Sequence, residues 1–177
     1  MKSLLILGAG GFGHMIQETA MQLGYEKVSF LDDAVKDPLV VGKCCDYRDF
    51  LDSYEAAVAA LGDNGMRLYW TEKLMEAGYQ VPALVHPSAV GSPRAVIGQG
   101  SFVLQRAVVN THTVVEHGVL INSGAVVDHD SYIASGAHIG LGSVVKSNCT
   151  IASKRKVEAG EVIFSTRRKI DGVSDRN

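Results

Sequence analysis

Cysteine, proline and tryptophan are scarce in this sequence of 177 residues, which holds three, four and one of them respectively. The cysteines are Cys44, Cys45 and Cys149. Adjacent cysteines rarely form a disulfide with each other, and the chain contains neither CxxC nor HxxxH spacing, which disfavours a structural zinc site. We therefore expect reduced thiols, a reducing compartment and no bound metal.

An excess of charge of one sign and a long hydrophobic run are also missing. The net charge is −2 at pH 7, and no long basic run offers a surface for nucleic acid. No apolar stretch approaches the roughly 20 residues that span a bilayer. Residues 1–7 lead directly into a glycine-rich turn, which is not the pattern of a signal peptide. These absences predict a soluble, cytoplasmic protein with no nucleic-acid and no membrane partner.

The strongest pattern that is present is a six-residue repeat in the second half. Twelve successive positions spaced by six residues, called anchors here, are all isoleucine or valine: Ile97, Val103, Val109, Val115, Ile121, Val127, Ile133, Ile139, Val145, Ile151, Val157 and Ile163. Glycine, or the similarly permissive Asn148, often follows an anchor after three residues, and a small residue such as Ser101 follows after four. This order predicts one short strand and one corner in each hexad.

One hexad cannot bury its apolar face alone, so the hexads must stack. Three hexads would form one triangular rung, which predicts a β-helix from about residue 86 to residue 163. A β-sandwich would instead show alternation with period two and irregularly spaced turns. Arg155 and Glu161 occupy the small-residue position late in the repeat. We therefore expect the last regular rung to end near residues 150–152, followed by a cap or, from residue 165, a polar tail.

The first half has the pattern of a nucleotide-binding α/β unit. An apolar strand at residues 2–7 leads into a GxGxxG turn that contains Gly10, Gly11 and Gly13, and residues 14–23 are helical in pattern. Glycines allow backbone N–H groups to approach an anion at the N-terminus of a helix. The strand–turn–helix context favours a binding role for these glycines, with a turn that serves only packing as the alternative.

Further strands are expected at residues 28–31, 55–61 and 81–85, and a second helix at residues 65–77. Polar residues or glycine follow two of these strands, and we predict that they contact the substrate: Asp32, Asp33, Gly62 and Asn64. An acid about 20 residues after the glycine turn can bind a ribose hydroxyl. About 85 residues precede the repeat, fewer than two mononucleotide-binding halves need, so a mononucleotide or nucleotide-sugar fits better than NAD(P).

Among the six histidines, His129 has the surroundings that a general base needs. It follows an anchor by two residues, so it should point out of the β-helix near a corner, between Asp128 and Asp130. His112 lies 18 residues before Asp130 and should stack against it one rung away. A carboxylate that orients an imidazole favours base chemistry. The spacing alone leaves open an exposed surface histidine without a catalytic role.

Together these motifs resemble the PglD/NeuD-like sugar O/N-acetyltransferases, a family of hexapeptide-repeat acyltransferases. The resemblance covers roughly residues 3–145. It rests on the glycine-rich unit, Phe30-Leu31-Asp32-Asp33, Gly62-Asp63-Asn64, His86-Pro87 and the stretch Ile121-Asn122-Ser123-Gly124-Ala125-Val126-Val127-Asp128-His129-Asp130. One departure is Phe12 in the glycine turn, where the family usually has histidine.

The resemblance implies the fold class, α/β plus β-solenoid. A Rossmann-like domain at residues 1–85 would hold a nucleotide-sugar, often a UDP-linked 4-amino sugar. A left-handed parallel β-helix would occupy residues 86–177, with a C-terminal cap or tail. The resemblance also implies a homotrimer with active sites between neighbouring β-helices, and acetyl-CoA as the acetyl donor.

The resemblance further implies roles for single residues. His129 would be the catalytic base and Asp130 its orienting partner. His138 would contact the thioester end of acetyl-CoA, and Ser147 would lie near its thiol. The predicted function is transfer of an acetyl group from acetyl-CoA to an amino or hydroxyl group of a nucleotide-linked sugar. The alternative is a non-catalytic nucleotide-sugar-binding or assembly protein on the same scaffold, whereas a nicotinamide oxidoreductase rests on GxGxxG alone.

Overall fold

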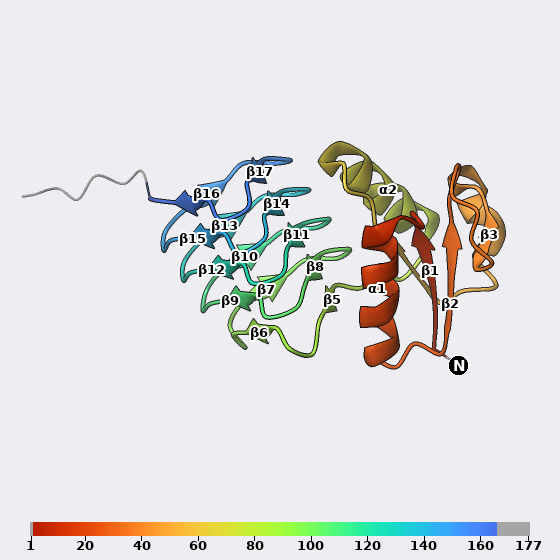
Figure 1. Ribbon diagram of the computed structural model, residues 1–177, viewed down its shortest axis with the longest axis horizontal. Coiled ribbons are helices and arrows are strands. Elements are labelled where there is room, and N and C mark those ends of the chain that lie inside the picture. Colours follow the sequence, from red (N-terminus) through yellow and green to blue (C-terminus); the bar gives the residue numbers. More distant parts are fainter. Residues whose placement is uncertain (1, 166–177) are drawn as a thin grey trace, which may run out of the picture.

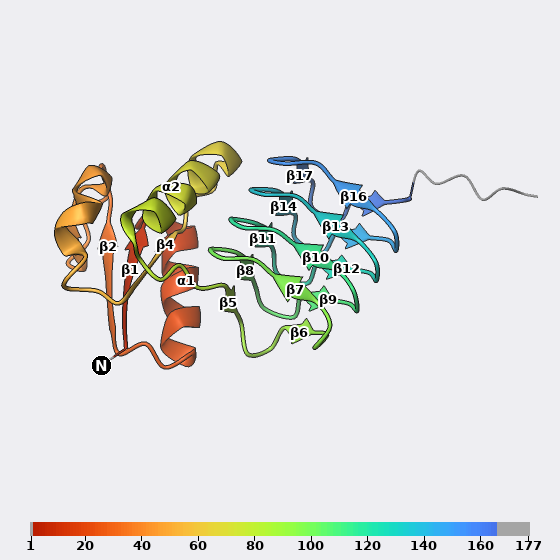
Figure 2. The same ribbon diagram turned by 180° about the vertical axis from the view of Figure 1, so that it is seen from behind.

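The computed structural model describes residues 2–165 and shows two parts side by side (Figures 1 and 2). The first part is a parallel sheet with strand order β3-β2-β1-β4. Its elements are β1 (Ser3–Leu7), α1 (Gly11–Gln22), β2 (Lys27–Leu31), β3 (Val40–Gly42), a 3₁₀ helix (Cys44–Phe50), β4 (Ala56–Ala59) and α2 (Asn64–Ala77). The polar tail predicted beyond residue 165 lies outside the described part of the chain.

The central strand β1 is buried on both faces because its residues alternate between two hydrophobic clusters. Ile6 packs in one cluster with Ile16 of α1, and Leu5 packs in the other with Leu74 of α2. All five residues of β1 are buried. A continuous apolar run is what a parallel strand covered on both sides requires. Within residues 2–165, no helix is both long and apolar enough to cross a membrane.

The second part is a parallel β-helix whose two-residue strands form three sheets. Face 1 holds β5 (Leu84–Val85), β8 (Phe102–Val103), β11 (Leu120–Ile121), β14 (His138–Ile139) and β17 (Lys156–Val157). Face 2 holds β6 (Val90–Gly91), β9 (Val108–Val109), β12 (Val126–Val127), β15 (Val144–Val145) and β18 (Val162–Ile163). Face 3 holds β7 (Val96–Ile97), β10 (Val114–Val115), β13 (Tyr132–Ile133) and β16 (Thr150–Ile151).

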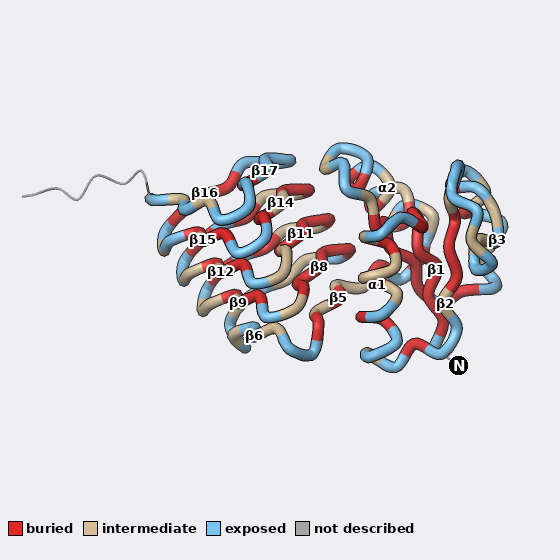
Figure 3. Tube along the Cα trace, in the orientation of Figure 1, coloured by how far each residue is buried: buried red, intermediate tan, exposed pale blue. Residues whose placement is uncertain are grey.

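The predicted register is confirmed by the strand pairing. Val115 pairs with Ile97 on one side and with Ile133 on the other, so residues one rung apart stack in columns. Ten of the twelve anchors are fully buried, and Ile97 and Ile163, at the two ends, are partly buried against the same core. Figure 3 shows these buried positions recurring in each successive rung.

From Gly100 to Gly160, each corner contains one residue in the left-handed backbone conformation, three positions after an anchor. Glycine fills about half of these positions and adopts the conformation without steric cost. The other corners hold non-glycine residues with φ of 56 to 58°: Arg106, His112, Asp130, Asn148 and Lys154. The predicted permissive role of Asn148 is therefore confirmed, and two residues of the candidate catalytic cluster share this special position.

Two predictions about element boundaries are wrong. The repeat does not end near residues 150–152 but continues through β17 and β18 to Ile163. Arg155 and Glu161 are tolerated because they lie at the end of the stack, where their charged groups pair at 3.7 Å. The strand predicted at residues 81–85 is not part of the N-terminal sheet, because Leu84–Val85 pairs with β8 of face 1. The fourth strand of the N-terminal sheet is the short β3.

The two parts share a hydrophobic cluster, so they pack as one body. Leu84, Phe102 and Leu120 project from face 1 into the cluster that contains residues of β1 and α1. The rings of Phe12 and Phe102 meet edge to face at 5.4 Å. This contact explains an apolar residue at position 12 of the glycine turn, since Phe12 packs against the β-helix. Face 1 is thus the side of the β-helix that meets the N-terminal part.

Arg67 of α2 fastens this junction. Its side chain is fully buried and its pKa is lowered to about 10, because burial disfavours the charge more than nearby Asp63 favours it. The guanidinium remains charged at neutral pH and donates hydrogen bonds to five oxygens: Leu61 O at 3.1 Å, Asn64 Oδ1 at 2.9 Å, Gly118 O at 2.9 Å, Gly136 O at 2.8 Å and Ala137 O at 3.3 Å. One side chain therefore joins the loop after β4 to two successive rungs.

Candidate functional site

The predicted base lies on the turn at residues 128–131, where face 2 meets face 3. The turn is fixed by the rungs on both sides. Its Asp130 N–H donates to Thr111 O at 3.1 Å, and Asn148 N–H donates to His129 O at 3.1 Å. This edge of the β-helix points away from the N-terminal part (Figures 1 and 2). The repeat therefore presents His129 at an exposed edge on a rigid support.

His129 and Asp130 form the pair that the sequence predicts. Nδ1 of His129 lies 2.7 Å from Oδ2 of Asp130. This hydrogen bond raises the pKa of His129 above its ordinary value of 6.5, with Asp128 and Asp130 also stabilising the charged ring. If Nδ1 carries the proton that binds Asp130, Nε2 is left as the acceptor. Within residues 2–165, Nε2 has no hydrogen-bond partner, so it is available to take a proton.

The acids on both sides of His129 are tied to the preceding rung. Asp128 Oδ1 accepts a hydrogen bond from Asn110 Nδ2 at 3.0 Å. The pKa of Asp128 is lowered, chiefly because the backbone N–H of His129 donates to its carboxylate. Asp130 Oδ1 lies 3.5 Å from Nδ1 of His112, which confirms the predicted stacking of these residues one rung apart.

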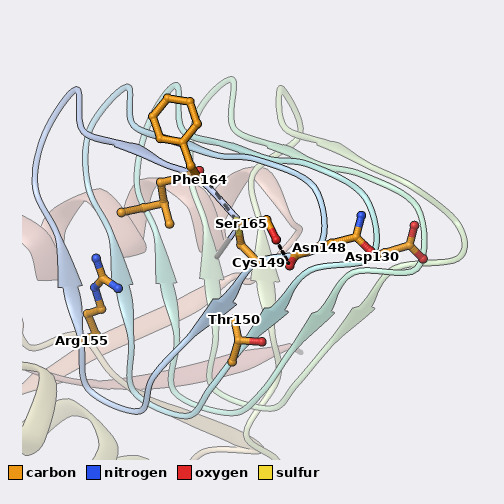
Figure 4. A pocket seen from close by; sticks show the side chains of 8 residues that line it. Asp130, Asn148, Cys149, Thr150, Arg155, Phe164 and Ser165 are labelled. Atoms are coloured by element: carbon orange, nitrogen blue, oxygen red, sulfur yellow. Dashed lines mark hydrogen bonds between the residues drawn. The ribbon is translucent and has the colours of Figure 1, made fainter. Parts of the chain in front are cut away.

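A cavity of about 270 Å³ lies beside Asp130 at the end of the β-helix. Its lining residues are Asp130, Asn148, Cys149, Thr150, Arg155, Ile163, Phe164 and Ser165. Figure 4 shows Asp130 and Asn148 together at the turn, with Arg155 on the far side of the cavity. The cavity therefore lies next to the candidate base and has a polar rim that includes the guanidinium of Arg155. The sequence pattern alone did not indicate this cavity.

Ser147 follows His129 by one rung and belongs to the same edge. Its carbonyl oxygen accepts a long contact from the Cys149 thiol at 3.8 Å. Ser147 does not line the cavity, although Asn148 and Cys149, the next two residues, do. Its predicted place near the thiol of acetyl-CoA stays a prediction.

His138 lies on β14 of face 1, beside the domain junction. Its Nε2 lies 3.1 Å from Asn122 Nδ2, and Asn122 Oδ1 accepts the N–H of Ser123 at 2.9 Å, which fixes the amide orientation. Nε2 of His138 therefore accepts, and Nδ1 carries the proton. Burial, with Arg67 and Lys156 nearby, lowers the pKa of His138 to about 4. The ring is thus a neutral donor at physiological pH.

The structure does not bring His129 and His138 together within one chain. His129 lies on the edge between faces 2 and 3, whereas His138 projects from face 1. In a three-sided prism, the edge between two faces is opposite the third face. The two predicted histidines therefore point in opposite directions, and a site that uses both requires two copies of the chain.

The N-terminal part contains a second cavity of about 290 Å³ at the carboxyl ends of β2 and β4, where ligands bind parallel sheets. Its lining residues are Asp32, Asp33, Ala34, Cys44, Leu61, Gly62, Asp63, Met66 and Trp70. The structure brings the predicted residues Asp32, Asp33 and Gly62 to this one cavity. The sequence pattern did not indicate Met66 and Trp70, which lie four residues apart on α2 and so share one face of the helix.

The predicted glycines differ in whether the structure leaves space for a side chain. A side chain at Gly13 would meet Gly8 O at 2.0 Å, so Gly13 serves the close packing of α1, which begins at Gly11 rather than at residue 14. Side chains at Gly10 and Gly11 would meet no atom within 4 Å. These two positions are open to a ligand, although neither lines the cavity.

The carboxylate of Asp32 organises the glycine turn. It accepts the backbone N–H groups of Ala9, Ala34 and Val35, each at 2.8 Å. Burial would raise the pKa of Asp32, but these three donors lower it below the ordinary value. Asp32 therefore has a structural task in addition to any contact with a ribose.

Asn64, another predicted substrate residue, is turned toward the β-helix. Its Nδ2 donates to Lys154 O at 2.9 Å, and its Oδ1 accepts from Arg67. Its neighbour Asp63 lines the cavity and caps α2 by accepting the N–H of Met66 at 2.8 Å. In the described part of the chain, no group of three histidine, cysteine or acidic side chains is placed to hold a metal ion.

Comparison with known proteins places this geometry in a family. Residues 3–74 match the PglD N-terminal domain family. The acetyltransferase domain of PglB from Neisseria gonorrhoeae, in complex with acetyl coenzyme A, is 31% identical with a TM-score of 0.82, over 92% of each chain. PerB from Caulobacter crescentus, in complex with CoA and GDP-perosamine, is 25% identical with a TM-score of 0.81, over 93% of this chain and 89% of that one.

These likenesses extend over both parts of the molecule and confirm the predicted fold class, a Rossmann-like α/β unit followed by a left-handed parallel β-helix. The winding sense is informative because ordinary crossover connections are right-handed. The match at 31% identity covers nearly the whole of both chains, and the N-terminal family match is independent of the repeat. The chain belongs to the PglD/NeuD-like family of sugar acetyltransferases.

Proposed function

We propose that this protein transfers the acetyl group of acetyl-CoA to an amino, or a hydroxyl, group of a nucleotide-linked sugar. The observation that carries the proposal is the His129–Asp130 pair, 2.7 Å apart on a rigid exposed turn. The ligands of the two similar proteins support it, since the PglB domain was solved with acetyl coenzyme A and PerB with CoA and GDP-perosamine.

His129 acts as the general base in this reaction. The sugar amine attacks the thioester carbonyl carbon, and Nε2 of His129 takes a proton from the attacking nitrogen. Collapse of the tetrahedral intermediate breaks the carbon–sulfur bond and releases CoA as a thiolate, to which the protonated His129 returns a proton. Asp130 holds the ring with Nδ1 protonated and stabilises the imidazolium that forms. The products are the acetylated sugar nucleotide and CoA with a free thiol.

His138 supplies a neutral hydrogen-bond donor to the thioester end of acetyl-CoA. Two features support this role. Asn122 directs the proton of His138 to Nδ1, and burial keeps the pKa near 4, so the ring polarises a carbonyl oxygen without competing as a base. Ser147 and the cavity beside Asp130 extend the proposed acetyl-CoA site along the edge of the β-helix.

A complete active site requires a neighbouring copy, because His129 and His138 lie on opposite sides of one β-helix. We place the site between two copies in a homotrimer closed about a three-fold axis. His129 and Asp130 come from one copy, and His138 with the nucleotide-sugar cavity comes from the next. Arg67 supports this pairing, since it ties the cavity residue Leu61 to Ala137, the residue before His138.

The surface of face 2 supports assembly as well. Its outward residues are valine in every rung: Val90, Val108, Val126, Val144 and Val162. Val90 is 62% exposed and Val162 is 42% exposed. A column of valine on an exposed sheet face is typical of a contact surface, and it borders the edge that carries His129. Light scattering that shows a monomer at micromolar concentration would contradict the trimer.

The remaining parts of the proposal concern the organisation and location of the protein. The N-terminal domain, about residues 1–85, binds the nucleotide-sugar, and the β-helix from residue 86 onward carries the acetyl chemistry. The cysteines Cys44, Cys45 and Cys149 are all unpaired, which supports a reducing compartment and thus the cytoplasm.

The experiment that tests the function is to mix the protein with acetyl-CoA and a panel of amino-sugar nucleotides and to follow release of the CoA thiol. We expect thiol release that depends on one class of acceptor, with the acetylated sugar identified by mass spectrometry. Binding of a nucleotide-sugar without thiol release from any acceptor would overturn the enzymatic proposal. The alternative of a non-catalytic nucleotide-sugar-binding protein would then replace it.

A further inference from the structure

We infer that His112 is a positioning residue for the proposed base, because it takes the second oxygen of the carboxylate that orients His129. The inference rests on the proposed function and concerns how the same site responds to pH. Oδ2 of Asp130 lies 2.7 Å from Nδ1 of His129, and Oδ1 lies 3.5 Å from Nδ1 of His112. One carboxylate therefore serves two imidazoles.

The stacked backbone of the repeat places His112 next to Asp130. His112 and Asp130 occupy the same corner position in successive rungs, with φ of 58° and 56°. Asp130 N–H donates to Thr111 O at 3.1 Å, which holds the two corners in register. Both side chains leave the backbone from equivalent positions on one edge. The stacking of the rungs thus places the two side chains next to each other.

Three other charged groups near this edge have partners: Asp128 with Asn110 at 3.0 Å, Arg155 with Glu161 at 3.7 Å, and Lys146 over the ring of Phe164 at 4.7 Å. Arg94 lies on the same edge one rung before His112, and within residues 2–165 it forms no ion pair with Asp130. From the following rung, the uncharged residues Ser147 and Asn148 continue the edge. Within the described residues, His112 and His129 are the ionisable side chains that lie within ion-pair distance of Asp130.

The contact with His112 weakens the stabilisation that Asp130 gives to the protonated form of His129. A carboxylate that also contacts the ring of His112 stabilises the imidazolium of His129 less than one that contacts His129 alone. A positive charge on one ring also opposes protonation of the other. Removing His112 should therefore raise the pKa of His129. A general base acts in its unprotonated form, so the pH below which the rate falls would move upward. A permanent cation at position 112 should have the opposite effect.

The repeat itself shows which substitutions this corner accepts. Equivalent corners hold Gly118 and Lys154, both with positive φ. His112→Gly therefore removes the imidazole, and His112→Lys introduces a fixed positive charge, in a backbone conformation that the chain already combines with each residue. Arg106→Gly is the matched control, because Arg106 has the same conformation but lies on the edge between faces 1 and 2.

Two measurements on the full-length protein test the inference. The first is an NMR titration of the His129 ring without substrates, and the second is the pH dependence of kcat/KM for acetyl transfer. We expect His112→Gly to raise the pKa of His129 and the acidic limb by roughly 0.2 to 0.7 pH units, as exposed charge pairs do. His112→Lys should lower both, and Arg106→Gly should change neither. Opposite shifts from two substitutions at one position would not arise from a general loss of stability.

The outcomes separate this inference from the proposed function. If neither His112 variant moves the titration of His129 while the wild type transfers acetyl groups, the role of His112 is refuted and the function stands. If the titration moves but His129→Ala retains full turnover, His129 is not the base. The proposed mechanism then fails, and the role of His112 in catalysis fails with it.

Discussion

Replacing Arg67 with methionine tests whether one buried guanidinium holds the two parts of the chain together. Methionine keeps most of the aliphatic volume but removes all five hydrogen bonds. Two buried carbonyl groups of the β-helix, those of Gly118 and Gly136, lose the donor, whereas Ala137 O keeps the N–H of Leu120 at 2.9 Å. Because these acceptors belong to rungs, the loss acts on the junction and not on α2 alone.

The expected loss of unfolding free energy in Arg67→Met follows from two opposing effects. Each buried acceptor left without a donor costs about 1–3 kcal/mol, so two of them cost about 4 kcal/mol at the midpoint. Removing the cation recovers its unfavourable burial, and the fall of the pKa of Arg67 from 12.5 to about 10 corresponds to roughly 3 kcal/mol. The net loss is on the order of 1 kcal/mol, or a decrease of roughly 2–4 °C in Tm for a chain of this length.

Urea-induced unfolding at fixed protein concentration measures this loss directly. Arg67→Lys should recover only part of it, because an ammonium cannot replace the planar fork that reaches several carbonyl groups. Lys73→Met is the control on the same helix, since Lys73 makes surface contacts with Glu76 and the ring of Tyr69, and it should leave the midpoint nearly unchanged. A wild-type midpoint for Arg67→Met would refute the idea that Arg67 fastens the junction.

Three further predictions concern the core, the glycine turn and the base. Val127→Asp places a carboxylate in the dry interior and should cost several kcal/mol, on the order of global unfolding, by thermal denaturation. A Cβ at Gly11 would meet no atom within 4 Å, so for Gly11→Val circular dichroism should show a folded protein while calorimetry shows weaker nucleotide-sugar binding; unchanged affinity would return the turn to a packing role. Asp130→Asn replaces the carboxylate that raises the pKa of His129 by a neutral amide, so the acidic limb of kcat/KM should move to lower pH, with a smaller loss of rate than His129→Ala causes; an unmoved limb would contradict the pairing.

The β-helix could be predicted because its signal is local and repeated. Each hexad carries its own anchor, corner residue and small residue, and the spacing alone places Val115 between Ile97 and Ile133. The end of the repeat was misjudged because Arg155 is charged at a position that is normally small. Only the structure shows that no rung follows β18 within residues 2–165, so the charge meets solvent and Glu161.

The part of the candidate site on the β-helix could be predicted from the repeat. The part at the junction between the N-terminal part and the β-helix could not. The contacts of Asp130 with His112 and His129 are fixed by spacing within the β-helix. The hydrogen bond of Asn64 with Lys154 O could not be predicted, because the two residues lie 90 positions apart in sequence. The burial of Arg67 had one faint signal, since it shares a helix face with buried Thr71 and Leu74, at spacings of four and seven residues.

The central claim is that His129 is the general base of acetyl transfer, and steady-state thiol release from acetyl-CoA by His129→Ala tests it most directly. His129 lies on an exposed turn, so the variant should fold, as circular dichroism and the oligomeric state can verify. Loss of a general base should lower kcat roughly 10²- to 10⁴-fold. His117→Ala is the control, because His117 has the same place in its hexad but contacts Ser135 and Glu72 at the junction, and its turnover should stay near that of the wild type. Full turnover by His129→Ala, or an equal loss in His117→Ala, would contradict the account.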